Sequence, residues 1–251
     1  MTVKAATRLY VEADLGAGVP LALGAPQTHY LRNVLRLEAG AAIALFNGRD
    51  GEWLGRVQEL GRNSGTVLVE ELSREQVPEP DLWLVFAPIK RARIDFMVEK
   101  ATELGVGAFR PVLTRRSVVD RINTERLGAV AIEAAEQSER LSVPSIAEPV
   151  KLDRFLAGWP EGRRLILCEE TGLAPPIAEA LSGIEKGVPA AILIGPEGGF
   201  EESELDAIRQ YPFVTRAGLG IRVLRADTAA LAALAVFQAL NGDWGQRRHR
   251  P

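Results

Sequence analysis

The chain has 251 residues, of which 47% are hydrophobic and 25% charged, and its formal net charge is −3 at pH 7. At about 150 residues per domain, this length predicts one large domain or two modest ones. The composition excludes a disordered or collagen-like chain, because nearly half of the residues can be buried in a core. Cys168 is the single cysteine, which excludes a disulfide framework and a four-thiolate zinc site. Two histidines are too few to suggest a histidine-rich catalytic centre, so we expect no metal.

No segment of the sequence has the features of a membrane or export signal. Residues 1–8 lack the apolar core of a signal peptide. The longest stretch without a strongly polar residue, 229–237, is about half of the roughly 20 residues that span a membrane. We therefore expect a soluble, cytoplasmic protein without a membrane partner.

Short runs rich in β-branched and aromatic side chains dominate the first 72 residues. These runs predict strands at residues 8–11, 43–46, 53–60 and 66–72. Residues 47–51, Asn-Gly-Arg-Asp-Gly, are typical of a hairpin turn, because glycine accepts positive φ angles. A helix is expected at about residues 27–37. The pattern indicates a small module like a β-barrel.

A polar stretch with two prolines, residues 73–81, predicts a linker. After it, continuous apolar runs alternate with helical patterns. Strands are expected at 82–87, 108–113, 165–168, 191–194 and 213–215. Helices are expected at 92–104, 124–139, 174–181, 201–210 and 228–240. Such alternation predicts an α/β fold with a mostly parallel sheet covered on both faces.

Charge is distributed unevenly along the chain. Residues 90–126 hold nine basic and five acidic side chains, and residues 207–251 hold seven basic and two acidic ones. The intervening residues 127–206 hold six basic and fifteen acidic side chains. A slightly acidic chain can therefore still present local basic surfaces that bind phosphates. Scattered, solvated arginines are the alternative that the composition leaves open.

The segment at residues 192–200, Ile-Leu-Ile-Gly-Pro-Glu-Gly-Gly-Phe, joins a predicted buried strand to a predicted helix. In open α/β sheets, ligands bind where such loops leave the carboxyl ends of the strands. Glycines let the backbone approach a ligand and offer it N–H and C=O groups. The segment is neither a dinucleotide fingerprint nor a phosphate loop, and the nearby Glu197, Glu201 and Glu202 would repel a polyphosphate. An ordinary glycine-rich connection is the alternative.

A second glycine-containing loop, residues 217–228, leads into the apolar C-terminal helix. Arg222 and Arg225 lie three residues apart in this loop, and two guanidinium groups can hold anionic oxygens. Asp227 or Thr228 is a candidate N-cap of the helix. A structural and a catalytic interpretation of Asp227 therefore both stand.

Basic residues also gather where strands give way to helices. Lys90, Arg91 and Arg93 enter the predicted helix at 92–104, whose N-terminus adds donors for a phosphate. Arg115 and Arg116 follow the next predicted strand. A solvated helix face is the alternative for this group.

The predicted helix of the first module carries a polar and an apolar face. Its polar face holds His29, Arg32 and Arg36, and its apolar face holds Leu31, Val34 and Leu35. The polar face is a candidate surface for a nucleic-acid backbone, with Arg8 as a further contact. A lone histidine is more often structural than functional.

Together, these segments resemble the RsmE-type 16S ribosomal RNA uridine-N3 methyltransferases of the SPOUT superfamily. The resemblance runs in order through residues 8–11, 29–36, 90, 99–106, 133–140, 193–200 and 219–228. The last two segments are highly specific. The chain has Ile221 where the family often has Pro or Lys, and Ala-Asp-Thr at 226–228 where the family usually shows Thr-Glu-Thr. The carboxylate at position 227 is therefore one methylene shorter than usual.

The resemblance implies a PUA-like RNA-binding β-barrel domain at residues 1–74 and a SPOUT methyltransferase domain at residues 75–251 with a deep trefoil knot. It implies that S-adenosylmethionine binds in the knot and that the enzyme is a homodimer with each site near the interface. The implied partner is 16S rRNA or the small ribosomal subunit. The basic tail at residues 247–250 either contacts RNA or is disordered, and we expect disorder.

The implied site residues fall into three groups. The cofactor is expected at Glu169, Ile194, Gly195, Pro196, Glu197, Gly198, Gly199, Phe200, Leu219, Gly220, Val223, Leu224 and Thr228. RNA contacts are expected from Arg8, His29, Arg32, Arg36, Lys90, Arg91, Arg115 and Arg116. The catalytic candidates are Arg222, Arg225, Asp227 and Glu197.

Methylation at uracil N3 requires removal of the N3 proton or stabilisation of the charge that develops there. We expect Arg222 or Arg225 to stabilise that charge and an RNA phosphate, and Asp227 or Glu197 to orient or accept the proton. The alternatives are a SPOUT methyltransferase acting on another RNA or at a ribose 2′-OH, and a non-catalytic RNA-binding ribosome assembly factor. A dinucleotide oxidoreductase is a more distant alternative, because the fingerprint is missing.

Overall fold

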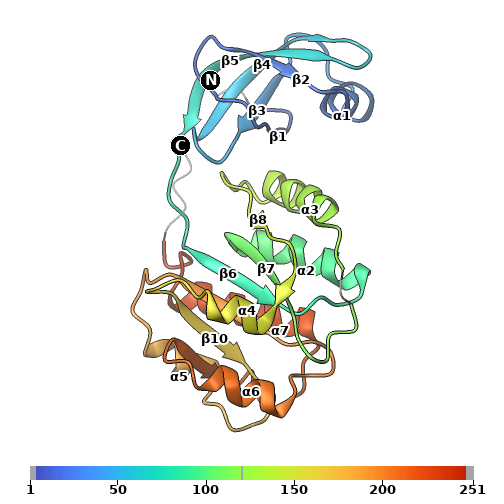
Figure 1. The fold of residues 1–251 in the computed structure, drawn as a ribbon. Helices are drawn as coiled ribbons and strands as arrows, with labels where there is room; N and C mark the ends of the chain where they lie inside the picture. Colours follow the sequence, from blue (N-terminus) through green and yellow to red (C-terminus); the bar gives the residue numbers. More distant parts are fainter. Residues whose placement is uncertain (1–3, 120, 247–251) are drawn as a thin grey trace. The chain divides into compact units, whose positions relative to one another are not determined.

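The computed structural model describes residues 4–119 and 121–246 (Figure 1). The basic tail at residues 247–250, for which we expect disorder rather than an RNA contact, lies outside the described residues. The chain forms two compact units. The N-terminal unit contains the residues up to Pro78 together with Ala135–Val143. The C-terminal unit contains Glu79–Ala134 and the residues from Pro144 onward.

The N-terminal unit is built on a five-stranded sheet with the order β1-β3-β4-β5-β2. Its strands are β1 (Arg8–Tyr10), β2 (Pro20–Leu23), β3 (Ala42–Phe46), β4 (Glu52–Leu60) and β5 (Gly65–Arg74). The predicted hairpin turn is confirmed, because β3 and β4 are antiparallel neighbours on either side of it. Register shifts between β4 and β5 mark bulges, which increase the local twist of a sheet. The buried side chains of Leu31, Ile43 and Val67 belong to the core of this unit.

The helix of the N-terminal unit differs in part from the prediction. α1 (Ala25–His29) begins earlier than expected and continues as a single π-helical turn, η1 (Tyr30–Val34). Leu31 is fully buried as predicted, but Val34 is 59% exposed, so its assignment to the apolar face is wrong. A π-turn has more residues per turn than an α-helix, which shifts the position of Val34 relative to the α-helical pattern.

The C-terminal unit contains a seven-stranded sheet with the order β12-β10-β11-β6-β7-β8, in which β9 also pairs with β7. The strands are β6 (Leu82–Phe86), β7 (Ala108–Leu113), β8 (Ser145–Ile146), β9 (Val150–Lys151), β10 (Arg164–Cys168), β11 (Ala190–Ile194) and β12 (Val214–Ala217). Each pair in this sheet is parallel, which confirms the predicted α/β class. Every residue of β11 is buried, as expected for a strand covered on both faces. The trefoil knot stays a prediction.

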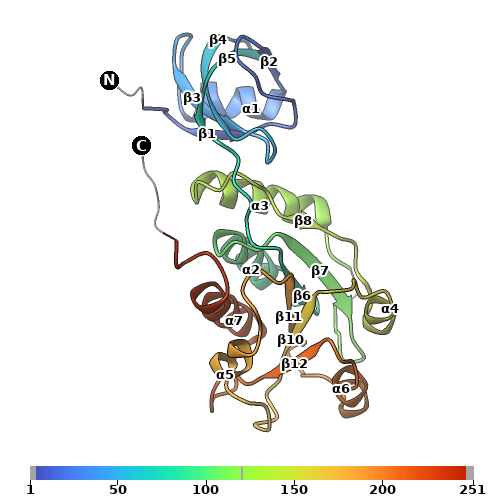
Figure 2. The same cartoon turned by 90° about the vertical axis from the view of Figure 1, so that its left-hand side faces the viewer.

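Helices cover both faces of the parallel sheet (Figure 2). Figure 2 shows α2 (Arg91–Glu103), α5 (Ile177–Ser182) and α7 (Ala226–Leu240) on one face and α4 (Leu152–Ala157) and α6 (Glu202–Arg209) on the other. The N-cap of α7 is Arg225, without a side-chain cap, so the interpretation of Asp227 or Thr228 as its N-cap is wrong. Among the described residues, no helix is long and apolar enough to cross a membrane.

The end of α3 (Thr124–Gln137) and the residues that follow it belong to the N-terminal unit, where they bind Arg8. The guanidinium donates to the carbonyl oxygens of Ala135 at 2.8 Å, Glu136 at 3.0 Å and Arg140 at 2.7 Å. It also donates to a carboxylate oxygen of Glu52 at 2.7 Å. The last carbonyl groups of a helix lack the regular intrahelical hydrogen bonds, and Arg8 adds donors at this helix end.

These contacts change the role assigned to Arg8. Its side chain is only 12% exposed, and burial lowers the pKa of Arg8 although the hydrogen bond and charge of Glu52 act against that shift. Its donors are directed at protein oxygens. Arg8 therefore has a structural role in the N-terminal unit, and its contact with RNA stays a prediction.

We predict that Arg8→Ala destabilises the N-terminal unit by about 2–4 kcal/mol, because it removes the half-buried guanidinium that donates to Glu52 and to three backbone carbonyls. Hydrogen–deuterium exchange should become faster in β1 and in residues 135–143. Arg49→Ala is the control, because its ion pair with Asp14 is solvent-exposed and exposed ion pairs contribute little to stability. Equal effects of the two substitutions would contradict the structural role.

Candidate active site

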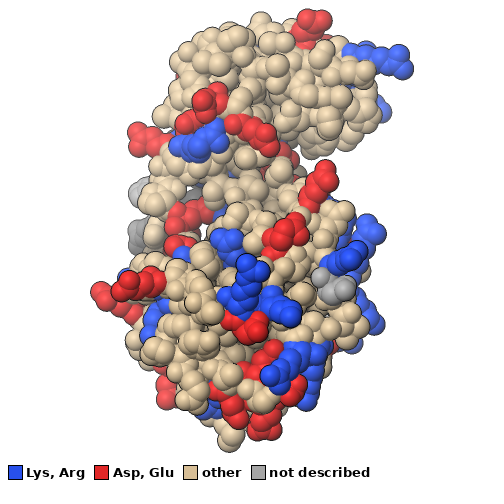
Figure 3. All heavy atoms as spheres, viewed as in Figure 1, with Lys and Arg blue, Asp and Glu red and all other residues tan. Residues whose placement is uncertain are grey.

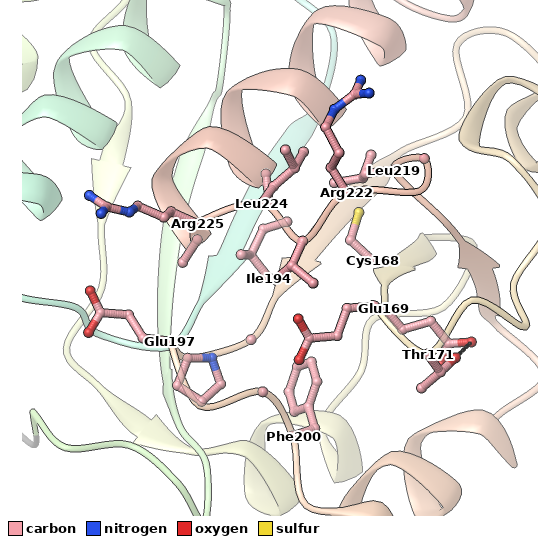
Figure 4. Close-up of a pocket in the computed structure, with 18 of the residues that line it drawn as sticks. Cys168, Glu169, Thr171, Ile194, Glu197, Phe200, Leu219, Arg222, Leu224 and Arg225 are labelled. Carbon is pink, nitrogen blue, oxygen red and sulfur yellow. Dashed lines mark hydrogen bonds between the residues drawn. The ribbon is translucent and has the colours of Figure 1, made fainter.

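A pocket of about 530 Å³ lies at the carboxyl ends of β10, β11 and β12 (Figure 4). Because β10 lies between β11 and β12 in the sheet, the loops that follow β11 and β12 flank the residue that follows β10, Glu169. Carboxyl ends of parallel strands are the usual place for a ligand in an open α/β sheet. The volume is within the range typical of small-molecule sites, about 300–1,000 Å³.

The loop after β11 forms the first wall of the pocket. Gly195 is closed against Phe200, since a Cβ atom added at Gly195 would lie 2.8 Å from the Phe200 ring. Gly199 has a φ angle of +66° and its N–H donates to the Pro196 carbonyl at 2.9 Å, which closes a tight turn. The glycines are therefore required by close packing and by backbone conformation.

The loop after β12 forms the second wall. Gly218 anchors its start, with its N–H donating to the Pro175 carbonyl at 2.8 Å and its carbonyl accepting from the Ile177 N–H at 3.0 Å. Within residues 4–119 and 121–246, the backbone N–H and C=O groups of residues 219–224 form no hydrogen bonds. These groups are therefore available to a ligand.

The floor of the pocket includes Ile194 and Cys168, both buried at strand ends. Burial raises the pKa of the Cys168 thiol to about 12. The group is therefore a neutral thiol at physiological pH and does not act as a thiolate nucleophile.

Glu169 lies on the pocket wall with its carboxylate near the ring of Phe200 (Figure 4). The carboxylate already accepts hydrogen bonds from Arg209 at 2.8 and 3.1 Å and from Arg216 at 2.7 Å. Thr171 adds a long contact at 3.4 Å. Sequence reasoning singled out Glu169 but missed both arginines. The available signal was Arg216, a charged residue within the strand that packs beside buried β10.

The mouth of the pocket is lined by charged side chains, among them Lys90, Arg93, Glu197, Arg222 and Arg225. Arg93 donates to Glu197 at 2.6 Å, so the two side chains form an ion pair at the mouth. Arg222 and Arg225 are exposed and form no ion pair within the described ranges. In Figure 4, Arg225 extends on the same side as Glu197, whereas Arg222 points away from Glu169 and Phe200.

Arg115 and Arg116 hold the outer side of the first wall. Arg116 donates to the Gly198 carbonyl at 3.0 Å, and Arg115 donates to Glu201 at 2.9 Å and Ser203 at 2.6 Å. The hydrogen bond from Ser203, followed by that from Arg115, lowers the pKa of Glu201. These two arginines therefore support the glycine loop in addition to any RNA contact.

The pocket brings together most of the expected cofactor residues and three of the four catalytic candidates. Gly198, Asp227 and Thr228 are the expected residues that do not line it. The Asp227 carboxylate instead accepts a hydrogen bond from the Thr228 N–H at 3.0 Å within the first turn of α7.

The expected RNA-contact residues divide between the two units. His29, Arg32 and Arg36 are exposed on the N-terminal unit, where Arg32 donates to the Gly61 carbonyl at 2.8 Å. Lys90 and Arg91 are exposed at the start of α2 in the C-terminal unit. Figure 3 shows Lys and Arg side chains over the C-terminal unit interspersed with Asp and Glu, so the basic character is local. No group of side chains suited to a metal ion occurs among the described residues.

Comparison with known families gives the class of the protein. Residues 76–238 match the model of an RNA methyltransferase domain, and residues 23–70 match that of an RNA methyltransferase PUA domain. The chain therefore belongs to the class of RNA methyltransferases that carry a PUA domain.

Individual relatives narrow this class. The ribosomal RNA small subunit methyltransferase E of Rickettsia conorii is 32% identical over 240 residues, which cover 93% of this chain and 95% of that protein. The protein of the same name from Synechocystis sp. is 32% identical, and the alignment covers 94% of this chain and 78% of that protein.

Solved structures agree with the sequence relatives. The crystal structure of ribosomal RNA small subunit methyltransferase E from Neisseria gonorrhoeae bound to S-adenosyl methionine aligns with a TM-score of 0.86 and 27% identity, covering 95% of this chain and 99% of that one. A methyltransferase from Legionella pneumophila in complex with the same cofactor aligns with a TM-score of 0.86 and 29% identity. The alignment covers 96% of this chain and 100% of that one. The chain belongs to the ribosomal RNA small subunit methyltransferase E family.

We predict that Cys168 resists alkylation by iodoacetamide at pH 8.5 in the folded protein and reacts rapidly in denaturant, because the buried thiol keeps its proton. The pKa of about 12 in the folded protein exceeds the ordinary value of 9.0, so between pH 9 and 12 the folded protein holds a proton that the unfolded chain has lost. The free energy of unfolding should therefore fall as the pH rises through this window, and it should fall less in Cys168→Ala, which lacks the thiol. Rapid labelling of the folded protein would contradict the assignment.

Proposed function

We propose that this protein transfers a methyl group from S-adenosylmethionine to N3 of a uridine in 16S rRNA of the small ribosomal subunit, in the cytoplasm. The pocket between two glycine-containing loops, with unpaired arginines at its mouth, is the observation that carries the proposal. Family membership and the cofactor-bound structures of relatives support it.

The chemistry of the pocket fits S-adenosylmethionine. The backbone groups of residues 219–224 can bind the polar edges of an adenosine, and Ile194, Leu219 and Phe200 offer apolar surface to its base. Residues 195–200 would hold the opposite side of the cofactor. When bound, S-adenosylmethionine supplies an electrophilic methyl group.

The residues at the mouth can prepare the uracil for attack. N3 carries a proton, and the ring becomes a competent nucleophile when that proton leaves or when a cation stabilises the developing charge. Arg225 or Arg222 supplies the cation, and Arg225 is favoured because it extends on the side of Glu197. Glu197 is favoured over Asp227 as the group that orients or accepts the proton, since Glu197 lines the pocket and Asp227 does not.

Exposed basic residues supply the RNA-binding surface. N3 lies on the pairing edge of uracil, so the target uridine must be unpaired or flipped out of a helix. Lys90 and Arg91 at the start of α2 can bind phosphates near the target, with added attraction from the helix N-terminus. The PUA domain, with His29, Arg32 and Arg36, would bind a second stretch of RNA.

Large apolar side chains at the rim of the pocket support a homodimer. Ile221 is 97% exposed, Val223 is 79% exposed, and Leu173 nearby is 77% exposed. Exposed apolar side chains grouped in this way mark interaction sites. A second copy of the chain covering them would lie next to the methyl-transfer site.

The deciding experiment locates the methyl group. Purified protein, S-adenosylmethionine with a labelled methyl group and either naked 16S rRNA or assembled 30S subunits should give one labelled uridine. A methyl group at N3 blocks base pairing, so reverse transcription should stop there. Label on a ribose 2′-OH or in another RNA would replace the substrate in this proposal. Cofactor binding without labelling of any RNA would favour a non-catalytic assembly factor.

We predict that Arg225→Ala lowers kcat by about 10²–10³-fold while the Kd for S-adenosylmethionine changes less than about threefold, because the lost cation acts on the transition state. Arg154→Ala, which removes an exposed arginine on α4, is the control and should leave both constants unchanged. Unchanged turnover in Arg225→Ala would remove this residue from the mechanism.

We predict that Gly195→Ala weakens S-adenosylmethionine binding by at least about tenfold, because its Cβ would displace the Phe200 ring and reshape the first wall. Calorimetric titration measures the change. Gly128→Ala in α3 is the matched control, since a Cβ there meets nothing within 4 Å and alanine is the better helix former. Equal affinities for the Gly195 variant and the wild type would contradict the wall geometry.

A further inference from the structure

A cluster of three charged side chains lies beside the pocket, in which Glu169 is buried and Arg209 and Arg216 are half-buried. Glu169 follows β10 and its side chain is 1% exposed. Its carboxylate oxygen Oε2 accepts from Nε of Arg209 at 3.1 Å and from Nη2 at 2.8 Å. Its Oε1 accepts from Nε of Arg216 at 2.7 Å and lies 2.5 Å from Nη2 of the same residue.

These contacts occupy the hydrogen-bond acceptor sites of the Glu169 carboxylate. A carboxylate has about four lone-pair sites, and the two guanidinium groups direct four nitrogen atoms at them. A hydroxyl or amino group of a ligand would therefore have to compete with these nitrogen atoms, and with the long 3.4 Å contact from Thr171, for the oxygens of Glu169. The geometry does not favour Glu169 as a direct ligand of the ribose or amino group.

The cluster connects the elements that carry the two walls. Arg209 is the last residue of α6, which follows the glycine loop of the first wall. Arg216 lies in β12, which leads directly into the second wall. Glu169 lies between them at the end of β10, and its backbone N–H donates to the Ala217 carbonyl at 3.1 Å. One carboxylate therefore holds the bases of both walls.

We infer that Arg209 and Arg216 are positioning residues for the methyl donor and that Glu169 is the anchor on which they converge. Each guanidinium directs two nitrogen atoms at one oxygen of the Glu169 carboxylate, and hydrogen bonds between charged groups are shorter and stronger than neutral ones. In this cluster the two pairs set the separation of the glycine loops at 195–200 and 218–225. The inference rests on the proposed function, because it assigns the cluster to the site of S-adenosylmethionine.

The test uses Glu169→Gln and Arg216→Gln in the full-length protein. Glu169→Gln removes the charge at nearly constant shape, and Arg216→Gln removes both the charge and the guanidinium that reaches Glu169. Each substitution should raise the Kd for S-adenosylmethionine at least tenfold. RNA affinity should stay within twofold of the wild type. The double variant should bind no more weakly than the weaker single variant, because either substitution breaks the same connection. Arg216→Lys, which keeps the charge but loses the fork, replaces Arg216→Gln if the latter does not fold.

Asp206→Asn is the matched control. Asp206 also pairs with Arg209, at 2.9 Å, but it is 62% exposed and is not connected to either wall through Glu169. This substitution should leave the Kd unchanged. A loss of cofactor affinity equal to that of Glu169→Gln would show that the loss of any carboxylate beside Arg209 is enough and that the connection between the walls does not matter, and it would overturn the inference.

Two further results would overturn the positioning role. If Glu169 binds the ribose directly, Arg216→Gln should retain or improve affinity, and Glu169→Gln should bind S-adenosylhomocysteine and its 2′- or 3′-deoxy analogues equally well. If the cluster only stabilises the fold, Tm should fall in the variants while the Kd, measured well below Tm, stays unchanged.

Hydrogen–deuterium exchange separates this inference from the proposed function. In the free protein, Glu169→Gln should increase exchange in both glycine loops and leave α3 unchanged. That result would support the positioning role whether or not the wild type binds S-adenosylmethionine. A wild type that binds no S-adenosylmethionine would contradict the proposed function. Unchanged exchange in both loops would overturn the positioning role alone.

Discussion

The parallel arrangement of β12, β10 and β11 is the constraint on which the candidate site depends. Because all three strands run in one direction, their carboxyl ends meet at one edge of the sheet. Two segments about 20 residues apart in sequence then face each other across the end of β10. Neither loop encloses a ligand alone. The pocket therefore results from strand order, and its glycines allow the two walls to pack closely against side chains such as Phe200.

Arginine has two different uses in this protein, and composition alone does not distinguish them. Arg8 and Arg216 are directed at protein oxygens, and Arg116 holds a loop carbonyl. Arg222 and Arg225 have no such partner within the described residues and lie at the mouth of the pocket. The excess of basic residues in parts of the chain therefore serves the framework of the site as well as its binding surface.

The long apolar strands and both glycine loops were predictable from sequence, because burial on two faces and tight turns leave clear local patterns. The edge strands β8 and β9 have two residues each, which is too short for any periodic pattern. The start of α7 was misplaced because Arg225 occupies the N-cap without a capping side chain. The partners of Glu169 were missed because Arg209 and Arg216 are 40 and 47 residues away in sequence. Only the tertiary fold brings these side chains together.

The inclusion of residues 135–143 in the N-terminal unit affects how the chain can be made and divided. During synthesis, Arg8 leaves the ribosome more than 120 residues before its acceptors at Ala135, Glu136 and Arg140. The N-terminal unit therefore cannot complete its native hydrogen bonding until over half of the polypeptide has emerged. A fragment cut at the proline-containing linker would also lack these acceptors, so an expression boundary placed there would separate a folding unit from part of itself.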